Sequence, residues 1–236
     1  MNESITTIPF TYLLVVFIPV SIVIGILHAW SLEWKNTIYA VVRMLAQLLL
    51  IGYFLTYIFE SDSASITVGV MSIMVFAASW IALRTIPDKR WNFYQFSLLS
   101  ILVGGGLTLV LVTQFVLKLS PWFMPRYMIP LAGMIFASSM NGVSLAAERL
   151  KAEMDRDVDY FEARGIALRA ALIPITNSLF AVGLVSLPGM MTGQILSGIS
   201  PLIAVRYQIM VMCMIFSAVG FSSSFFLILI KKKMLK

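Results

Sequence analysis

Residues 10–30 read FTYLLVVFIPVSIVIGILHAW. The stretch contains no Asp, Glu, Lys or Arg, and about 20 apolar residues are enough for a helix to cross a bilayer. No basic residue precedes it, because the only charged side chain before it is Glu3. We therefore predict that residues 10–30 form a first membrane span and not a cleaved secretory signal.

Six similar stretches follow, so the sequence predicts an all-α polytopic membrane protein of about seven helices. Of its 236 residues, 60% are hydrophobic and 12% are charged, whereas an average soluble domain has about 25% charged residues. That composition excludes an ordinary soluble enzyme and a disordered chain, and the lone Cys213 excludes a disulfide scaffold. We expect one permease domain over residues 1–236, with further spans at 37–59, 65–84, 96–117, 128–147, 170–188 and 202–230.

The basic residues predict an orientation. Fourteen of the 17 Lys and Arg residues fall on one side of the membrane when the predicted spans alternate in direction. Because basic residues collect in cytoplasmic connections, the N-terminus is expected outside and the C-terminus in the cytoplasm. The net charge of +6 is explained in this way, without a nucleic-acid partner.

Residues 148–169 form the predicted cytoplasmic loop, which holds eleven of the chain's charged residues. Leu150, Met154, Val158 and Phe161 recur at steps of four, four and three, which is the spacing of an amphipathic helix. We predict a short cytoplasmic helix here, with Lys151 spaced to pair with Asp155 and Glu153 with Arg156. It would either lie on the membrane surface as a connector or dock a soluble partner.

The sequence lacks the parts of a self-powered enzyme or pump. It has no Gly-x-x-x-x-Gly-Lys-Ser/Thr loop and one histidine, His28, so no ATP site or histidine metal cluster is expected. All Asp and Glu residues fall in loops or at span ends, so the spans offer no acidic proton relay. No cofactor is expected in this chain, and uphill transport would need energy from another subunit.

Polar and sulfur-bearing residues inside the spans are the candidates for a pathway. Such polar groups either bond neighbouring helices or line the route of a solute. Thioethers suit soft metals, which makes Met190 and Met191 weak metal candidates beside a simple packing role. The Gly104–Gly106 run predicts a close helix approach. The polar candidates are Arg43, Gln47, Asn141, Asn177 and Gln208.

A broken segment is expected after the sixth span. Pro188 and Gly189 should interrupt the helix, and Gly189 is expected to need a backbone conformation that other residues avoid. Non-helical backbone at membrane depth is tolerated where protein or a water-filled cavity surrounds it. We therefore place Gln194, with Met190 and Met191, near a permeation path or a dimer interface.

Several stretches resemble the bacterial iron-export ABC transporter permease family, to which plant aluminium-tolerance permeases look distantly related. The most specific is the block LPGMM within residues 182–196, and the resemblance extends over nearly the whole chain. It implies a membrane permease that works with a separate cytoplasmic ATPase, as two permeases with two ATPases, in iron efflux. The matching stretches are RMLAQL (43–48), GY (52–53), IPLAGMI (129–135), AALIP (170–174), NS (177–178), VGLVSLPGMMTGQIL (182–196), SP (200–201) and AVRYQIM (204–210).

One departure affects the coupling to an ATPase. The family's cytoplasmic loop usually carries a Leu-Gly-Ala-Thr-Pro stretch that looks like the docking element, and this chain has none there. The docking candidates are then Tyr160, Phe161, Arg164 and Ile166. Two other functions stay open from the residues: a stand-alone carrier or channel for metal ions or small solutes, and a membrane scaffold that recruits a soluble partner.

Overall fold

The structure, a computed structural model, describes residues 8–61 and 63–234. This part of the chain is helical, and its one β-type contact is an isolated bridge between Val182 and Ser186. The chain divides at Ser61 into two compact units, residues 1–61 and 62–236, which are described separately.

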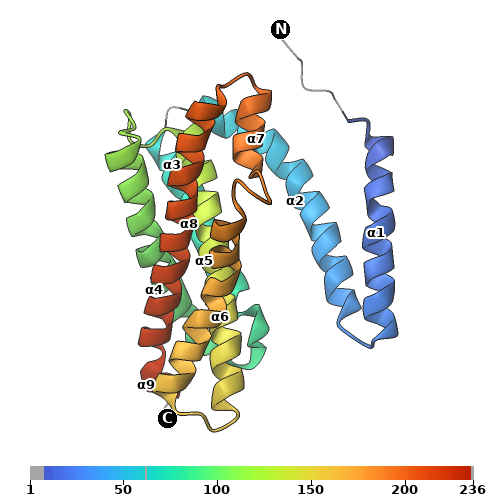
Figure 1. The fold of residues 1–236 in the computed structure, drawn as a ribbon, viewed down its shortest axis with the longest axis vertical. Helices are drawn as coiled ribbons and strands as arrows, with labels where there is room; N and C mark the ends of the chain where they lie inside the picture. The colour runs from blue at the N-terminus through green and yellow to red at the C-terminus, as the bar shows by residue number, and fades with distance from the viewer. Residues whose placement is uncertain (1–7, 62, 235–236) are drawn as a thin grey trace. The chain divides into compact units, whose positions relative to one another are not determined.

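The first unit is a helical hairpin of α1 (Phe10–Ala29) and α2 (Trp34–Glu60), drawn in blue in Figure 1. Both helices are long and apolar enough to cross a membrane. Arg43 and Gln47 lie one turn apart on α2, and both side chains are exposed.

The second unit is a helical bundle that also contains two short 3₁₀ turns. Figure 1 shows α7 at one end of this bundle and the connection between α5 and α6 at the other. Its elements are α3 (Ala64–Ala82), η1 (Leu83–Thr85), η2 (Pro87–Lys89), α4 (Arg90–Val110), the π-helical turn η3 (Leu111–Val116), α5 (Pro125–Met154), α6 (Tyr160–Ala181), α7 (Gly189–Leu196), α8 (Pro201–Leu229) and α9 (Lys231–Met234).

The predicted all-α polytopic membrane fold is confirmed. Six helices of the described residues have the length and composition of membrane spans, namely α1, α2, α3, α4 with its π-helical turn, α5 and α8. The predicted sixth span corresponds to α6, which is 22 residues long but begins at Tyr160 and ends at Ala181. The predicted range of 170–188 was therefore displaced toward the C-terminus. The orientation across the membrane stays a prediction.

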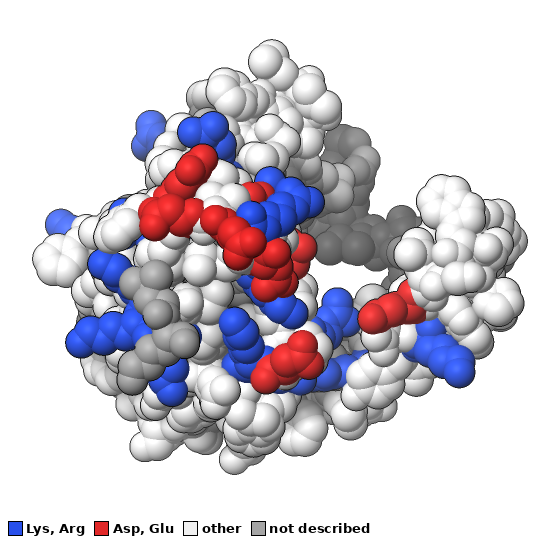
Figure 2. Space-filling model, turned by 90° about the horizontal axis from the view of Figure 1, so that it is seen from below, with Lys and Arg blue, Asp and Glu red and all other residues white. Residues whose placement is uncertain are grey.

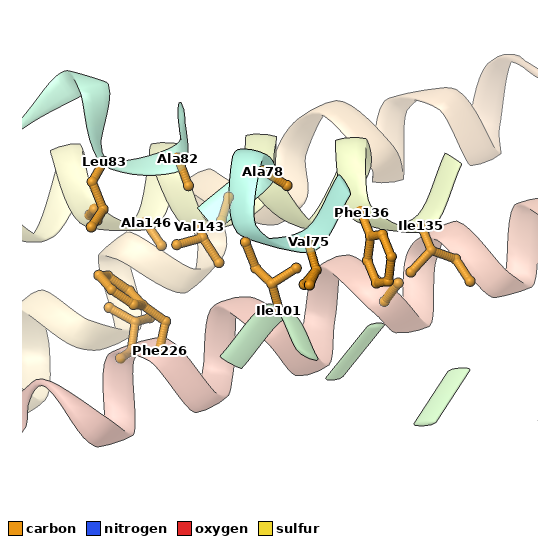
Figure 3. Close-up of a cluster of buried hydrophobic side chains, with 14 of the residues drawn as sticks. Val75, Ala78, Ala82, Leu83, Ile101, Ile135, Phe136, Val143, Ala146 and Phe226 are labelled. Carbon is orange, nitrogen blue, oxygen red and sulfur yellow. The ribbon is translucent and has the colours of Figure 1, made fainter. Parts of the chain in front are cut away.

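The core of the bundle lies between α3, α4, α5 and α8. Figure 3 shows apolar side chains from these four helices, and Leu83 from η1, pointing toward one another. These buried side chains make close van der Waals contacts with one another. Such contacts stabilise a helical bundle in a membrane, where the surrounding lipid is as apolar as the side chains. The labelled residues are Val75, Ala78, Ala82, Leu83, Ile101, Ile135, Phe136, Val143, Ala146 and Phe226.

Small residues bring α8 very close to α4 and α5. A Cβ atom added to Gly104 would lie 2.7 Å from the backbone nitrogen of Ser222, and one added to Gly142 would lie 2.8 Å from the Oγ of Ser223. The Ser222 hydroxyl donates to the Ser139 Oγ over 3.0 Å. The close approach predicted from the glycine run is thus confirmed at Gly104, whereas Gly106 has no neighbour within 4 Å.

The predicted separate cytoplasmic helix is wrong. Leu150 and Met154 belong to the end of α5, Val158 lies in a short connection, and Phe161 belongs to the first turn of α6. No helix-breaking residue follows the apolar part of α5, so the helix continues through its charged residues to Met154. Asp159 then starts α6 by accepting a hydrogen bond of 2.9 Å from the Phe161 N–H. The charged stretch is therefore the tip of a two-helix hairpin.

The break after α6 is confirmed, but its decisive residue is not the predicted one. The helix ends at Ala181, and the next residues turn at Gly183, whose φ of +83° favours glycine. Pro188 is the N-cap of α7, and its backbone is extended, as is typical of the residue just before a helix. Gly189 has no positive φ, and an added Cβ would meet nothing within 4 Å. The expectation of a special backbone at Gly189 is therefore wrong.

Candidate functional site

The hairpin tip carries charges of both signs, which Figure 2 shows on the face of the molecule seen from below. Arg149 Nη2 lies 2.6 Å from Glu153 Oε1, and the Glu153 residue is only 5% exposed. Lys151 Nζ lies 3.7 Å from Asp88 Oδ2 and so links α5 to η2. These partners replace the predicted pairs, because α5 ends at Met154, so Asp155 and Arg156 lie beyond the helix that carries Lys151 and Glu153.

Tyr160 is not a surface residue, although it was predicted as a docking candidate. It is 1% exposed, and its hydroxyl donates to the Leu227 carbonyl of α8. Burial raises the pKa of Tyr160, while the charge of Arg164 acts in the opposite direction. Tyr160 therefore holds the start of α6 against α8 and offers nothing to a partner.

The other docking candidates remain accessible. Phe161 is 55% exposed, with Lys231 Nζ 4.3 Å from its ring centroid and Arg164 Cζ 5.3 Å away. Cations at such distances are attracted by the face of an aromatic ring and hold it in place. Ile166 is half-buried on the same helix. We call Phe161, Arg164, Ile166 and Lys231 the tip surface.

A pocket lies between the middle of α5, α6 and α8, and we call it the polar pocket because Ser138, Asn141 and Ser178 line it among mostly apolar residues. Its volume is about 280 Å³, and Ser138 and Asn141 from α5 face it together with Pro174 and Ser178 from α6. Pro174 has no N–H, so it removes a backbone hydrogen bond inside α6. Ser138, Asn141 and Ser178 together place oxygen and amide groups about halfway along α5. The lining is completed by Gly142, Leu145, Ala171, Ile175, Met212, Ile215 and Val219.

A second pocket lies beside α7, and we call it the α7 pocket. Its volume is about 640 Å³. Met190 and Gln194 line it, as the predicted pathway role would require, and the Gln194 Oε1 is buried without a hydrogen-bond partner. The other lining residues are Leu117, Arg126, Tyr127, Pro130, Leu131, Met134, Ile199, Ile203, Tyr207 and Met210.

The remaining predicted residues are not brought into these pockets. Asn177 is exposed one turn from Pro174, and Met191 lies beside Met190 without lining the α7 pocket. Gln208 is buried in α8 with its Oε1 unpartnered. Arg43 and Gln47 belong to the first unit. Among the described residues, no three His, Cys, Asp or Glu side chains are grouped to hold a metal ion.

Sequence reasoning missed Ser138 and Ser178, although a local signal for them exists. Ser138 and Asn141 are three residues apart and Pro174 and Ser178 are four apart, so each pair shares one face of its helix. Two such polar faces on consecutive spans could have indicated a shared pocket. Arg126 and Met134 carry no comparable signal, because the α7 pocket joins residues from distant parts of the chain.

Comparison with known proteins gives a family and several curated relatives. The model of a family described as "Uncharacterised protein family (UPF0014)" matches residues 10–235. The probable iron export permease protein FetB of Escherichia coli is 35% identical, over 94% of this chain and 87% of its own length.

Two further relatives come from a cyanobacterium and a plant. The UPF0014 membrane protein slr1647 of Synechocystis is 35% identical over 73% of each chain. Protein ALUMINUM SENSITIVE 3 of Arabidopsis thaliana is 35% identical over 82% of this chain and 74% of its own length. No solved structure matches the chain significantly.

Proposed function

The chain belongs to the UPF0014 family of membrane proteins, and from this premise we propose that it is the permease subunit of an ABC transporter that exports iron or another metal ion. A separate cytoplasmic ATPase supplies the energy, and two permeases assemble with two ATPases in the bacterial inner membrane. The name of the Escherichia coli relative, a probable iron export permease, supports the transport role.

The observation that carries the proposal is the length of α6. This one helix contains Phe161 and Arg164 of the tip surface and lines the polar pocket with Pro174 and Ser178. A partner bound at the tip surface thus contacts a helix that also lines the pocket. The tip surface and the pocket are the two parts that a permease driven by another subunit requires.

In the proposed pathway a cation passes the polar pocket, which lies halfway along α5 and is lined by the exposed residues Asn141 and Ser178. Ser138, Asn141 and Ser178 supply uncharged oxygen atoms, which can replace part of the hydration shell of an ion. Uncharged ligands hold an ion weakly enough to release it. A carboxylate in the same place would bind it more tightly and slow its exit.

In the proposed assembly the tip surface enters a cleft of the ATPase. Phe161 presents an exposed ring, and the cations of Arg164 and Lys231 surround it. The matching surface on the ATPase is therefore an apolar pocket with an acidic rim. Ile166 lies about 140° around α6 from Phe161 and so adds apolar area on another side of the same helix end.

The experiment reconstitutes the permease with its cognate ATPase in vesicles and measures ATP hydrolysis and iron efflux. Phe161→Asp should reduce the stimulated hydrolysis about tenfold or more, because truncating a central aromatic at an interface costs about 2 kcal/mol. Glu162→Ala, which changes the next exposed residue, is the matched control and should keep most of the stimulation. Equal stimulation by the wild type and Phe161→Asp would exclude the tip surface as the docking site.

A further inference from the structure

The α7 pocket combines a largely apolar lining with one full positive charge. Arg126 is exposed at the start of α5, and no acidic side chain lines the pocket. The two ion pairs found within residues 8–61 and 63–234 both lie at the hairpin tip and do not involve Arg126. The guanidinium group at this pocket is thus available to an external anion.

The pocket has a polar end and an apolar end. Arg126 is the second residue of α5, and Met134 follows eight residues later, which is about 12 Å along the helix axis. Met190 from α7 and Met210 from α8 add flexible apolar side chains to the lining. A molecule that fills this space must carry its charge at one end and an apolar chain at the other.

The three thioethers do not make this pocket a site for a bare metal ion. A cation bound at Met134, Met190 and Met210 would share the pocket with Arg126 and would find no carboxylate to balance its charge. In surroundings of low dielectric constant that repulsion is much stronger than in water. The charge of the lining therefore selects an anion, and the methionines serve as apolar contacts.

Gln194 adds a requirement for a hydrogen-bond donor. Its Oε1 is buried and has no partner in the protein, and a buried acceptor left unpaired costs free energy. A hydroxyl group on the bound molecule would satisfy it. Tyr127 and Tyr207 also line the pocket, and amphipathic rings of this kind are enriched where a membrane meets water.

We propose that the α7 pocket binds an anionic phospholipid of the surrounding bilayer whose headgroup carries hydroxyl groups, as phosphatidylglycerol does. Its phosphate pairs with Arg126, a headgroup hydroxyl donates to Gln194, and an acyl chain lies along Met134, Met190 and Met210. The binding is a property of the permease chain by itself, and it does not depend on the transported substrate or on the ATPase.

The test uses the purified full chain and an equimolar mixture of phosphatidylglycerol and phosphatidylcholine with the same acyl chains. Native mass spectrometry measures the ratio of the two bound lipids. The wild type should favour phosphatidylglycerol, and Arg126→Gln should reduce this preference about fivefold, the effect of one basic residue at a lipid surface. Arg126→Lys should retain it. In a second equimolar mixture, Gln194→Leu should lower the preference for phosphatidylglycerol over phosphatidylethanol, an anionic phosphodiester whose headgroup has no hydroxyl.

Lys118→Gln is the matched control, because it removes the same charge from an exposed residue just after η3 that does not line the pocket. It should leave the preference unchanged. The proposal is overturned if the wild type shows no preference, or if Arg126→Gln and Lys118→Gln behave alike. Displacement of the lipid by millimolar glycerol phosphate would assign the site to a free phosphate ester instead.

Discussion

The helices α8 and α6 are both long, yet the bundle holds them differently. α8 buries residues from Ala204 to Leu227, and at Ser222 its backbone lies close enough to α4 to exclude any side chain on Gly104. α6 buries residues only from Tyr160 to Ile175, and its second half borders the polar pocket or is exposed. The comparison distinguishes a closely packed set of helices, α4, α5 and α8, which we call the frame, from α6, which we call the arm and which is buried mainly in its first half, near the hairpin tip.

The largest expected effect tests the frame. Gly104→Leu places a side chain where a Cβ would already lie 2.7 Å from a backbone atom of α8, so the helices must separate. Overpacking of this kind costs up to about 3 kcal/mol. Unfolding of the purified protein in detergent would measure the loss of stability.

Gly106→Leu is the control for this change, since nothing lies within 4 Å of a Cβ there. It should leave the unfolding midpoint nearly unchanged. If Gly104→Leu and Gly106→Leu lowered stability equally, the close contact between α4 and α8 at Gly104 would not be the cause.

The next largest effect is expected from a substitution in the polar pocket beside α6. Asn141→Leu removes the amide that lines the polar pocket, and loss of one polar contact to an ion should lower efflux about tenfold, or about 1.4 kcal/mol. Asn177→Leu is its counterpart, because Asn177 is exposed outside the pocket. Metal efflux from vesicles with equal amounts of each variant would separate the two residues, and equal losses would contradict a pathway through this pocket.

The smallest effect tests the anchor of the arm. Tyr160→Phe removes the hydroxyl that donates to the Leu227 carbonyl and should cost about 1 kcal/mol of stability at neutral pH. The folded protein raises the pKa of Tyr160 above its ordinary value of 10.0, so this stabilisation is complete below that pH and is lost as the pH rises through the folded pKa.

The stability gap between the wild type and Tyr160→Phe should therefore narrow as the pH rises above 10 and through the folded pKa of Tyr160. Unfolding midpoints at neutral and alkaline pH would show it. ATPase stimulation per folded molecule should be unchanged, because Tyr160 is buried. A strong loss of stimulation would instead indicate that Tyr160 takes part in docking the ATPase.

The membrane spans could be predicted because hydropathy is a local property of the chain. The hairpin tip could not, because the steps from Leu150 to Phe161 fit one amphipathic helix as well as two helix ends separated by a turn. The turn depends on Asp159 capping α6 and on Asp157 adopting a positive φ of 60°, neither of which changes the apolar pattern.

The candidate pockets were predicted only in part for a related reason. Asn141 and Gln194 could be singled out as polar residues in apolar segments, and each does line a pocket. Their neighbours Ser178 and Arg126 come from other helices, and the packing that brings them together is not local. Adjacent residues can also differ, because successive positions on a helix face different directions. Met190 lines the α7 pocket, whereas Met191 does not.

The length of α5, which is helical from Pro125 to Met154 with Pro130 inside it, has a mechanical consequence. Its 30 residues make a rod about 45 Å long, with Arg126 near one end, Glu153 near the other and Gly142 pressed against α8 close to the middle. That contact can serve as a fulcrum. A tilt of about 5° around it would swing each end by roughly 2 Å in opposite directions, so a pull at the hairpin tip would shift one wall of the α7 pocket.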